Sequence, residues 1–447
     1  MIETTNSERG GATPPASTRM VVVGAGFAGG SFLRNLPPTL RQPGETLLVD
    51  HGDRYAFIPL IHEVAVGRVH PDSVLTPIAP EIEAPYDVLR AAATGVDLQN
   101  NILLTSSGSI KYRYLVLASG SVAEPPPEEF SEHFQTFWSL ADALRLRSAL
   151  NEAWRAALRK ESLSLGGLTI AIVGGGATGV ELAAEIAVLF RYLRKRTARA
   201  PAEKPRVVLL EATDRLVGWL DTYFHEVAME ELTRLGVEVW LNAPVTEANE
   251  EGVEAGSEWL PASTRVWTTG IQANPLVKNL PGEHDRAGRV LVSDYLTLPG
   301  HPEIYVLGDS GVYEHPRLGT LPPTASVAVQ QGPYAARDVG RRLRGLPEKK
   351  RRPFEFFDRG YVVSLGPESA VADPLGVKLR GRAAQALYRS IFLYYMKSSR
   401  GRLLTGADWA MERPLGRIGF DLGRSPSAVG RQQKGRSSSG FDRRLAD

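Results

Sequence analysis

The strongest constraint on the fold is a glycine-rich turn near the start of the chain. Residues 20–30 read MVVVGAGFAGG, in which four apolar residues typical of a buried parallel strand lead directly into the turn and a helix-compatible run. This is the fingerprint of a dinucleotide-binding unit, where Gly24 makes the turn, Gly26 lets a pyrophosphate approach and Gly29 packs helix on strand. The next strand, TLLVD, ends 21 residues after Gly29 at Asp50, where a carboxylate would bind a ribose hydroxyl.

The same pattern returns later in the chain. Residues 169–184 read TIAIVGGGATGVELAA, and Gly174, Gly176 and Gly179 take the places of the three glycines in the first fingerprint. The following apolar strand ends at Glu211, 32 residues after Gly179, because the predicted helix is long and is followed by a proline-containing loop. Two fingerprints 150 residues apart, each followed by an acid, predict two domains that bind two dinucleotides.

Further predicted strands end in residues that suit a ligand crevice. One strand, YRYLVLASG, leads to Ser119 and Gly120, and another, at 265–268, leads to Gly270. The segment EIYVLGD ends in Asp309, and an aspartate at the carboxyl end of a parallel strand faces the crevice of an open α/β sheet. A helix-capping or turn role for Asp309 is the alternative.

Composition narrows the chemistry. The 447 residues carry a net charge of +2, which by itself indicates no nucleic-acid partner. There are no cysteines, which excludes disulfide chemistry, thiolate catalysis, cysteine zinc sites and iron–sulfur clusters. The histidines show no metal-ligand spacing, so no metal site is predicted, and His51, His62 and His70 are expected in loops or at the surface.

The C-terminal part is basic, with 20 Lys and Arg against 10 Asp and Glu in residues 346–447. It contains the most apolar stretch of the chain, AAQALYRSIFLYYM at 383–396. This stretch is too short to span a bilayer, but a basic amphipathic helix can lie on an anionic membrane. Packing of its apolar face on the protein's own core, or against a second copy in a homodimer, is the alternative. A helical wheel places these residues on that face: Ala384, Leu387, Tyr388, Ile391 and Tyr395.

Targeting signals are not evident in the sequence. No apolar run reaches the length of a membrane-spanning helix, and residues 1–18 lack the apolar centre of a signal peptide. We therefore expect a peripheral protein on the cytoplasmic face of the cell membrane.

Taken in order, the motifs between residues 20 and 415 resemble those of type II, non-proton-pumping NADH:quinone oxidoreductases. Flavoproteins with two dinucleotide-binding domains share the first seven motifs in general. The last two, together with ADPLGVKLRG at 372–381, resemble the quinone-reducing branch. The motifs are VVVGAGFAG, TLLVD, YRYLVLASG, IVGGGATGVELA, VVLLE, VWTTG, IYVLGD, PTASVAVQQG and FFDRGYVVSLG.

The resemblance implies an α/β fold with two Rossmann-like dinucleotide-binding domains, for FAD and NADH, and a C-terminal membrane-associating segment. The implied boundaries are 19–125 and 290–345 for the split FAD-binding domain, 126–289 for the NADH-binding domain, 346–422 for the quinone and membrane region, and 1–18 and 423–447 for disordered tails. The implied cofactor-binding residues are Gly24, Gly26, Gly29, Asp50, Ser119, Gly120 and Asp309 for FAD, and Gly174, Gly176, Gly179, Glu211 and Gly270 for NADH. Glu211 would disfavour NADPH, a preference that Arg215 could soften.

The resemblance also implies a quinone site. A helix that starts over the flavin would bring the amide groups of Gln330 and Gln331 near a quinone carbonyl, while the family commonly has a glutamine where this chain has the shorter Ser326. Glu181 matches a carboxylate that the family places near the flavin, where it relays protons to the quinone; the alternative is an acid that complements the helix dipole. Lys378 matches a lysine close to the quinone tunnel, and a plain surface lysine is the alternative.

The implied reaction passes hydride from NADH to the flavin and two electrons from the flavin to a quinone of the ubiquinone, menaquinone or plastoquinone type. Two other functions stay open on the sequence alone. One is a related flavin reductase whose acceptor is a small iron–sulfur protein, and the other is a flavin-binding redox sensor or interaction protein with little turnover. NADH oxidation measured with and without a quinone would separate them.

Overall fold

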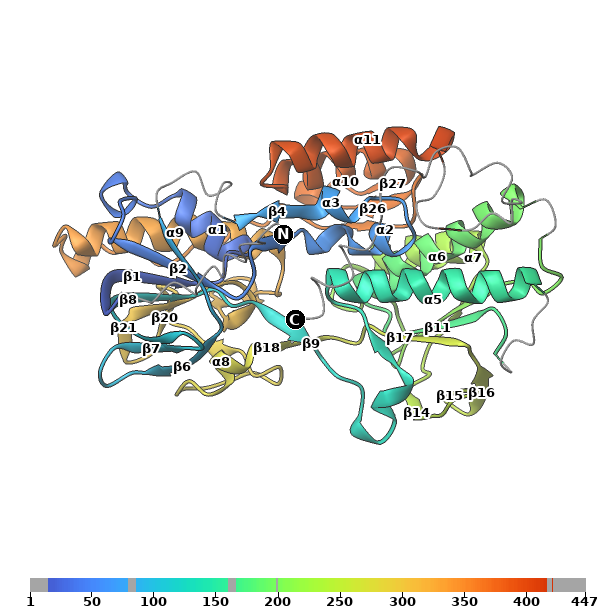
Figure 1. Ribbon diagram of the computed structural model, residues 1–447, viewed down its shortest axis with the longest axis horizontal. Helices are drawn as coiled ribbons and strands as arrows, with labels where there is room; N and C mark the ends of the chain where they lie inside the picture. Colours follow the sequence, from blue (N-terminus) through green and yellow to red (C-terminus); the bar gives the residue numbers. More distant parts are fainter. Residues whose placement is uncertain (1–14, 79–85, 160–165, 198–199, 416–419, 421–447) are drawn as a thin grey trace, which may run out of the picture. The chain divides into compact units, whose positions relative to one another are not determined.

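The computed structural model describes residues 15–78, 86–159, 166–197, 200–415 and 420. The chain forms two compact units, each assembled from separate stretches of sequence (Figure 1). The described residues of the first unit are 15–55, 77–78, 86–122 and 271–359, and those of the second are 56–76, 123–159, 166–197, 200–270, 360–415 and 420.

The first unit is built on a mainly parallel sheet in the order β20-β21-β8-β1-β2-β5, which β6 and β7 extend in antiparallel fashion from β8. β1 (Ser17–Val23) pairs with β2 (Thr46–Asp50) on one side and β8 (Gly108–Leu117) on the other. The end of β1 is apolar on both alternating faces and buried, as expected of a central parallel strand. The other strands of this sheet are β5 (Asp87–Arg90), β6 (Ala93–Asp97), β7 (Ile102–Thr105), β20 (Thr297–Leu298) and β21 (His301–Val306).

Helices α1 (Phe27–Arg34) and α9 (Ala325–Leu343) pack side by side in this unit (Figure 1). Their close approach depends on Gly332, because a Cβ there would lie 2.6 Å from the backbone nitrogen of Phe32 and 2.7 Å from the carbonyl oxygen of Ala28. The short elements of the unit are η1 (Pro38–Leu40), α8 (Pro275–Lys278), β19 (Val290–Leu291), η4 (Gly308–Ser310), β22 (Gly311–Val312), β23 (Glu314–His315), β24 (Gly319–Thr320) and η5 (Glu348–Lys350).

The second unit contains a five-stranded parallel sheet in the order β10-β17-β11-β12-β13. β11 (Thr169–Val173) is central and leads into α6 (Ala177–Arg196), as β1 leads into α1 in the first unit. The remaining elements of this part are η3 (Glu128–His133), β10 (Gln135–Thr136), α5 (Leu140–Arg159), β12 (Arg206–Leu210), α7 (Thr222–Leu235), β13 (Val237–Trp240), β17 (Thr264–Trp267) and the meander β14 (Val245–Ala248), β15 (Gly252–Ala255) and β16 (Glu258–Pro261).

The C-terminal part of the chain packs within the second unit on residues 56–76. An antiparallel sheet of β25 (Val362–Ser364), β26 (Ala370–Ala372) and β27 (Leu379–Arg380), with η6 (Pro374–Gly376), precedes α10 (Gly381–Tyr395) and α11 (Ser399–Leu415). α11 contacts α3 (Pro71–Val74), and the rings of Phe57 and Phe392 lie 5.8 Å apart. Two further short elements of this unit are η2 (Ile58–Leu60) and α2 (Ile61–Ala65), and α2 lies against α5 and α6.

The α/β fold and the strand, turn and helix at each fingerprint are confirmed. β1 starts at Ser17, inside the tail expected at 1–18, because Ser17 and Thr18 pair with β8. Residues 271–289 belong to the first unit and residues 56–76 to the second, which differs from the boundaries expected from the sequence. The tail expected at 423–447 lies outside the described residues.

Candidate active site

The first glycine turn leaves a helix N-terminus open to an anion. Gly24 has a φ of +93°, and a Cβ there would lie 2.4 Å from the carbonyl oxygen of Ala118. A Cβ at Gly29 would lie 1.9 Å from the carbonyl oxygen of Gly24, so any side chain would push α1 away from the turn. Gly26, the N-cap of α1, has nothing within 4 Å of its Cβ position. Phosphate oxygens can therefore reach the first N–H groups of the helix.

The acid at the end of β2 is fixed beside this turn. Asp50 Oδ2 accepts a hydrogen bond from the backbone nitrogen of Ala25 at 2.9 Å, and Oδ1 accepts one from the backbone nitrogen of Gly52 at 2.9 Å. A carboxylate has about four lone-pair positions, so acceptor capacity remains for a ribose hydroxyl.

The neighbouring parallel strands β8 and β21 bring the other predicted residues of this unit together. Asp309 Oδ2 accepts a hydrogen bond from Ser121 Oγ at 2.8 Å, and burial raises the pKa of Asp309. Ser310 Oγ lies 3.1 Å from Ser119 Oγ and 3.3 Å from the carbonyl oxygen of Gly120. Ser119, Gly120 and Asp309 therefore form one polar edge after the ends of these two strands, and their contact with a flavin stays a prediction.

The glutamines of α9 both support the backbone. Gln331 is buried, and its Oε1 accepts a hydrogen bond from the backbone nitrogen of Gly308 at 2.6 Å, which holds the turn before Asp309. Gln330 bonds in both directions to the backbone of Phe357, at 3.0 Å each, and its Nε2 also lies 3.2 Å from the carbonyl oxygen of Ser326. Contact of either glutamine with a quinone stays a prediction.

The second glycine turn repeats the geometry of the first. Gly174 has a φ of +108°, and a Cβ there would lie 2.9 Å from the backbone of Thr268. A Cβ at Gly179 would lie 1.9 Å from the carbonyl oxygen of Gly174, whereas nothing lies within 4 Å of the Cβ position of Gly176. Gly176 is the N-cap of α6, so this helix also presents an open N-terminus.

The acid of the second turn is held by three hydrogen bonds. Glu211 Oε2 accepts from the backbone nitrogen of Gly175 at 2.6 Å, and Oε1 accepts from the backbone nitrogen and Oγ1 of Thr213 at 2.7 Å each. The Arg215 guanidinium donates to the carbonyl oxygen of Leu220 at 3.2 Å, so its own loop holds it. Both turns thus fit the adenosine diphosphate part of a dinucleotide, because each combines an open helix N-terminus with a fixed acid.

Gly270 lies three residues after the end of β17, the strand beside the second turn. Its φ is +158°, and a Cβ there would lie 2.6 Å from Oε2 of Glu124, whose backbone nitrogen donates to the carbonyl oxygen of Gly270 at 3.0 Å. Glu124 is exposed and its side chain is flexible, so this contact by itself does not require a glycine here.

A buried polar row joins three distant segments of the second unit. His62 Nε2 lies 3.2 Å from the hydroxyl of Tyr388, and His62 Nδ1 lies 3.6 Å from Glu181 Oε2. Glu181 Oε1 accepts a hydrogen bond from the backbone nitrogen of Ser364 at 3.0 Å. Burial raises the pKa of Glu181, and the neighbouring His62 opposes this shift. His62 is 3% exposed, so the expectation of a loop or surface position is wrong; it lies in α2, inside the unit.

A fully buried charge cluster also starts from α2. Arg68 Nη1 lies 2.6 Å from Glu185 Oε1 and 3.3 Å from Glu63 Oε1, and Trp409 Nε1 donates to Glu63 Oε2 at 2.6 Å. Two carboxylates share one guanidinium here, and burial raises the pKa of Glu63. Trp409 of α11 therefore completes a cluster whose other members come from α2, the segment after it and α6.

Lys378 lies at the surface of the second unit. Its Nζ donates to Asp221 Oδ1 at 3.0 Å and lies 5.0 Å from the centre of the Tyr223 ring. This environment fits the surface alternative, and a role for Lys378 at a quinone tunnel stays a prediction.

α10 turns part of its predicted apolar face inward. Ala384 and Tyr388 are fully buried, so for these two residues packing on the protein's own core is confirmed. Among the side chains of α10 and α11 that the structure describes, the most exposed apolar ones are instead Tyr394, at 72%, and Leu403, at 76%. Within the part of the chain that the structure describes, no helix has the length and apolar character needed to cross a membrane.

Comparison with known proteins gives a consistent assignment. Residues 18–332 match the family model described as pyridine nucleotide-disulphide oxidoreductase. The chain is 29% identical over 421 residues to the type II NADH:quinone oxidoreductase Ndh of Mycobacterium tuberculosis, covering 90% of this chain and 89% of that protein. It is 27% identical to the demethylphylloquinone reductase NdbB of Synechocystis, covering 90% and 97%.

A solved structure shows the same fold. NDH2 from Plasmodium falciparum, in complex with NADH, matches with a TM-score of 0.80 at 17% identity. The match covers 90% of this chain and 99% of that one.

Proposed function

The chain belongs to the pyridine nucleotide-disulphide oxidoreductase family, and we propose that within this family it is a type II NADH:quinone oxidoreductase. The observation that carries the proposal is the pair of open glycine turns, one in each unit and each with its own fixed acid. When bound, FAD accepts hydride from NADH and returns two electrons to a quinone. The chain contains no cysteine, so a redox-active disulfide has no part in this chemistry.

The acceptor is inferred from the relatives. One is named a type II NADH:quinone oxidoreductase and another a demethylphylloquinone reductase, and each match spans about nine-tenths of this chain. These names support a quinone rather than an iron–sulfur protein as the acceptor.

The residues of the two turns act by binding and orientation. The N-terminus of α1 and Asp50 hold the adenosine diphosphate part of FAD, and Asp309 binds its ribityl chain. The N-terminus of α6 holds the NADH pyrophosphate, and Glu211 binds the adenosine ribose. Backbone N–H groups hold Asp50 and Glu211, and the hydroxyl of Ser121 holds Asp309, so binding requires little local ordering.

Glu181 supplies a proton for quinone reduction. NADH, one proton and a quinone give NAD⁺ and a quinol, so one proton must come from solution in addition to the hydride. The carboxyl of Glu181 stays protonated to higher pH than an exposed glutamate, because burial raises its pKa. His62 and Tyr388 extend from it as a buried row that can resupply the proton.

Quinone-dependent NADH oxidation by the FAD-loaded protein tests this function. Glu181→Gln should lower turnover with a short-chain quinone by about 100-fold, the size of a general-acid contribution. Ferricyanide takes up no proton, so turnover with ferricyanide should stay nearly unchanged. Quinone turnover of the unmodified protein should fall as pH rises through the raised pKa of Glu181, because only the protonated carboxyl can donate.

A matched control is Glu226→Gln, which changes an exposed glutamate of α7. It should leave turnover with both acceptors unchanged. An equal fall of both activities in Glu181→Gln would show a structural role for this residue. Unmodified, FAD-loaded protein that oxidises NADH no faster when quinone is added would overturn the proposed function.

Coenzyme choice is a second prediction. The Glu211 carboxylate should repel the 2′-phosphate of NADPH by about 1–4 kcal/mol, depending on local screening. Glu211→Gln keeps the shape and one acceptor oxygen, so it should lower the ratio of kcat/KM for NADH to that for NADPH by about tenfold. Steady-state kinetics with both coenzymes measures the ratio. Equal efficiency with NADH and NADPH in the unmodified protein would contradict the role given to Glu211.

Membrane attachment is a further part of the proposal. Long-tailed quinones dissolve in lipid, so the enzyme must meet the bilayer to reach them. The exposed apolar residues Tyr394 and Leu403 lie on α10 and α11, and the exposed Arg400 precedes Leu403 by three residues on α11, which suits an anionic surface. The inward-facing Tyr388 and Trp409 belong to the core, so attachment uses the outer sides of these helices.

Leu403→Glu should weaken binding to anionic vesicles by at least about tenfold, because it replaces an insertable side chain worth about 1.5–3 kcal/mol and adds repulsion. Vesicle sedimentation measures the effect. Leu318→Glu is the control, since this leucine of the first unit is 50% exposed and its replacement should leave vesicle binding unchanged. Equal loss of vesicle binding in both variants would show that charge alone governs binding. Unchanged vesicle binding of Leu403→Glu would show that α11 does not contact the membrane.

A further inference from the structure

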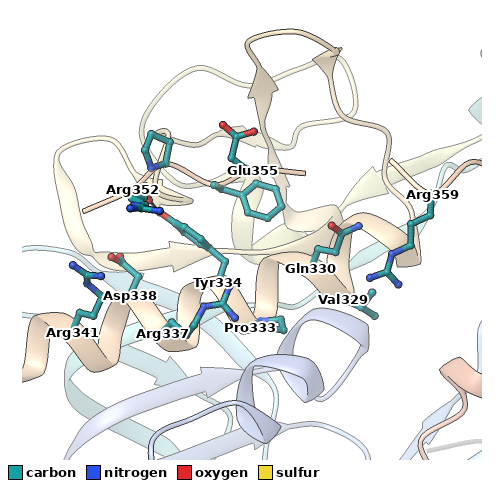
Figure 2. A pocket seen from close by; sticks show the side chains of 12 residues that line it. Val329, Gln330, Pro333, Tyr334, Arg337, Asp338, Arg341, Arg352, Glu355 and Arg359 are labelled. Carbon is teal, nitrogen blue, oxygen red and sulfur yellow. Dashed lines mark hydrogen bonds between the residues drawn. The ribbon is translucent and has the colours of Figure 1, made fainter. Parts of the chain in front are cut away.

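A basic groove runs along α9 in the first unit (Figure 2), and no residue of either glycine turn lines it. Its volume is about 540 Å³, within the range of about 300–1,000 Å³ that small-molecule sites occupy. One wall is a face of α9 and the other is the segment 352–359, which follows α9 in the chain. Neither wall includes a residue to which the proposed function gives a role. Gln330, which the family resemblance places near a quinone, has its amide bound to the backbone.

The groove is preformed, because hydrogen bonds hold its two walls together at both ends. Gln330 bonds to the backbone of Phe357 at one end, at 3.0 Å in both directions. The hydroxyl of Tyr334 donates to the carbonyl oxygen of Arg352 at 2.7 Å near the other end. Phe354 is buried between these points, and its ring lies 5.5 Å from that of Tyr334. A ligand would therefore meet fixed walls rather than a loop that must first be ordered.

Four arginines line the groove, from both walls. Arg337 and Arg341 belong to α9, and Arg352 and Arg359 belong to the segment (Figure 2). Among the residues that the structure describes, Arg337, Arg352 and Arg359 form no ion pair with a carboxylate, and all three are exposed. Guanidinium groups bind phosphate in a bidentate manner, so this set is suited to an anion with several oxygens.

The two carboxylates of the groove already have cationic partners. Asp338 accepts three hydrogen bonds from Arg351 at 2.6–3.0 Å and one from the hydroxyl of Tyr305 at 2.7 Å. Glu355 lies 3.7 Å from the guanidinium of Arg317. The positive charge of the four arginines is therefore not neutralised from within the groove.

We propose that this groove binds a phosphorylated anion of mononucleotide size. The phosphates would lie between Arg337 and Arg352, and a flat base would lie against Pro333 and Tyr334, both of which line the groove. The site is independent of the reaction proposed above, because neither glycine turn contributes to it. It gives the enzyme a means to bind a second anionic metabolite while both dinucleotides are in place.

Calorimetric titration of the FAD-loaded protein, saturated with NAD⁺, tests the proposal. NAD⁺ occupies the second glycine turn, so ATP cannot report binding there. ATP and inorganic tripolyphosphate should bind saturably, with affinity that falls as salt is added, and adenosine should not bind. Tighter binding of ATP than of tripolyphosphate would show that the base contacts Pro333 and Tyr334. Equal affinity for the two would show that the groove binds the phosphates alone.

The double variant Arg337→Glu and Arg352→Glu should weaken ATP binding by at least about tenfold. Arg344→Glu makes the same change of sign at an exposed arginine just after α9, outside the groove, and should bind ATP as the unmodified protein does. FAD content and NADH turnover with ferricyanide confirm that each variant is folded. If the double variant fails this check, Arg359→Gln replaces it, with a smaller loss expected. No saturable binding of ATP, or the same affinity in the folded groove variants as in the unmodified protein, would overturn the proposal.

Discussion

Replacing Gly176 by valine is expected to leave a yellow protein whose flavin NADH no longer reduces. Gly176 has φ −68° and ψ −179°, an extended conformation that valine adopts, and nothing lies within 4 Å of its Cβ position. The fold should therefore tolerate the side chain, which would occupy the space where the pyrophosphate meets α6. Loss of one or two charge-assisted hydrogen bonds, at about 1.5–3 kcal/mol each, should lower kcat/KM for NADH by about 100-fold or more. Rapid mixing with NADH while flavin absorbance is followed measures the loss.

The matched variant in the first unit is Gly26→Val. Gly26 has φ −62° and ψ −160° and equal space at its Cβ position, so this protein should also fold, but without FAD. Circular dichroism and the FAD released on denaturation distinguish the two variants. If Gly26→Val kept its flavin and lost reduction by NADH, while Gly176→Val lost its flavin, the assignment would be reversed. FAD would then bind at the second turn and NADH at the first.

These two turns are the part of the site that sequence predicts best. Gly24 and Gly174 need positive φ, and Gly29 and Gly179 have no room for a Cβ, so the glycine spacing follows from local geometry. Asp50 and Glu211 are recognisable because each ends the strand that follows its fingerprint. The position of these strands inside a parallel sheet is also predictable, because a strand that is apolar on both faces is typical of a parallel sheet covered on both sides.

The polar residues of the second unit are different, because their partners are distant in the chain. His62 meets Tyr388 across 326 residues, and Glu63 meets Trp409 across 346. No local pattern distinguishes the histidine of IHEVA from a surface histidine, so its burial could not be predicted. Residues 56–76 join the second unit for the same reason, since they pack on α5, α6, α10 and α11, which are all distant in the chain.

The two glutamine amides of α9 show a further limit of prediction from the sequence. Gln330 and Gln331 are adjacent, and both amides could serve a ligand. The structure directs one to the backbone of Gly308 and the other to the backbone of Phe357. Adjacent helix residues point in different directions, and only the packing of α9 decides what each one meets.

Arg68→Met is expected to be among the most destabilising single changes in the chain. It removes a guanidinium that Glu63 and Glu185 share in a fully buried cluster. Breaking a buried ion pair from one side costs about 3–5 kcal/mol, because the remaining charge loses its partner. For a unit of this size the melting temperature should fall by about 10 °C. Thermal unfolding of the FAD-loaded protein measures the shift.

The pH dependence distinguishes lost charge pairing from lost packing. Burial already raises the pKa of Glu63; Arg68 and Arg389 oppose this shift, so loss of Arg68 raises the pKa further. A group whose pKa is higher in the folded state stabilises that state below its unfolded pKa and loses this contribution as pH rises through the folded pKa. The free energy of unfolding that Arg68→Met loses relative to the unmodified protein should therefore be largest in neutral and alkaline solution and smaller in acid.

Two comparison variants complete this test. Arg382→Met removes an exposed arginine, 3.6 Å from Glu368, and should cost no more than about 1 kcal/mol at any pH. If Arg68→Met does not fold, Trp409→Phe removes only the donor to Glu63 and should cost about 1–3 kcal/mol with the same pH trend. If the loss of unfolding free energy in Arg68→Met did not change with pH, Arg68 would stabilise the unit through its packing. Pairing with the carboxyls depends on pH because their charge does, whereas packing does not.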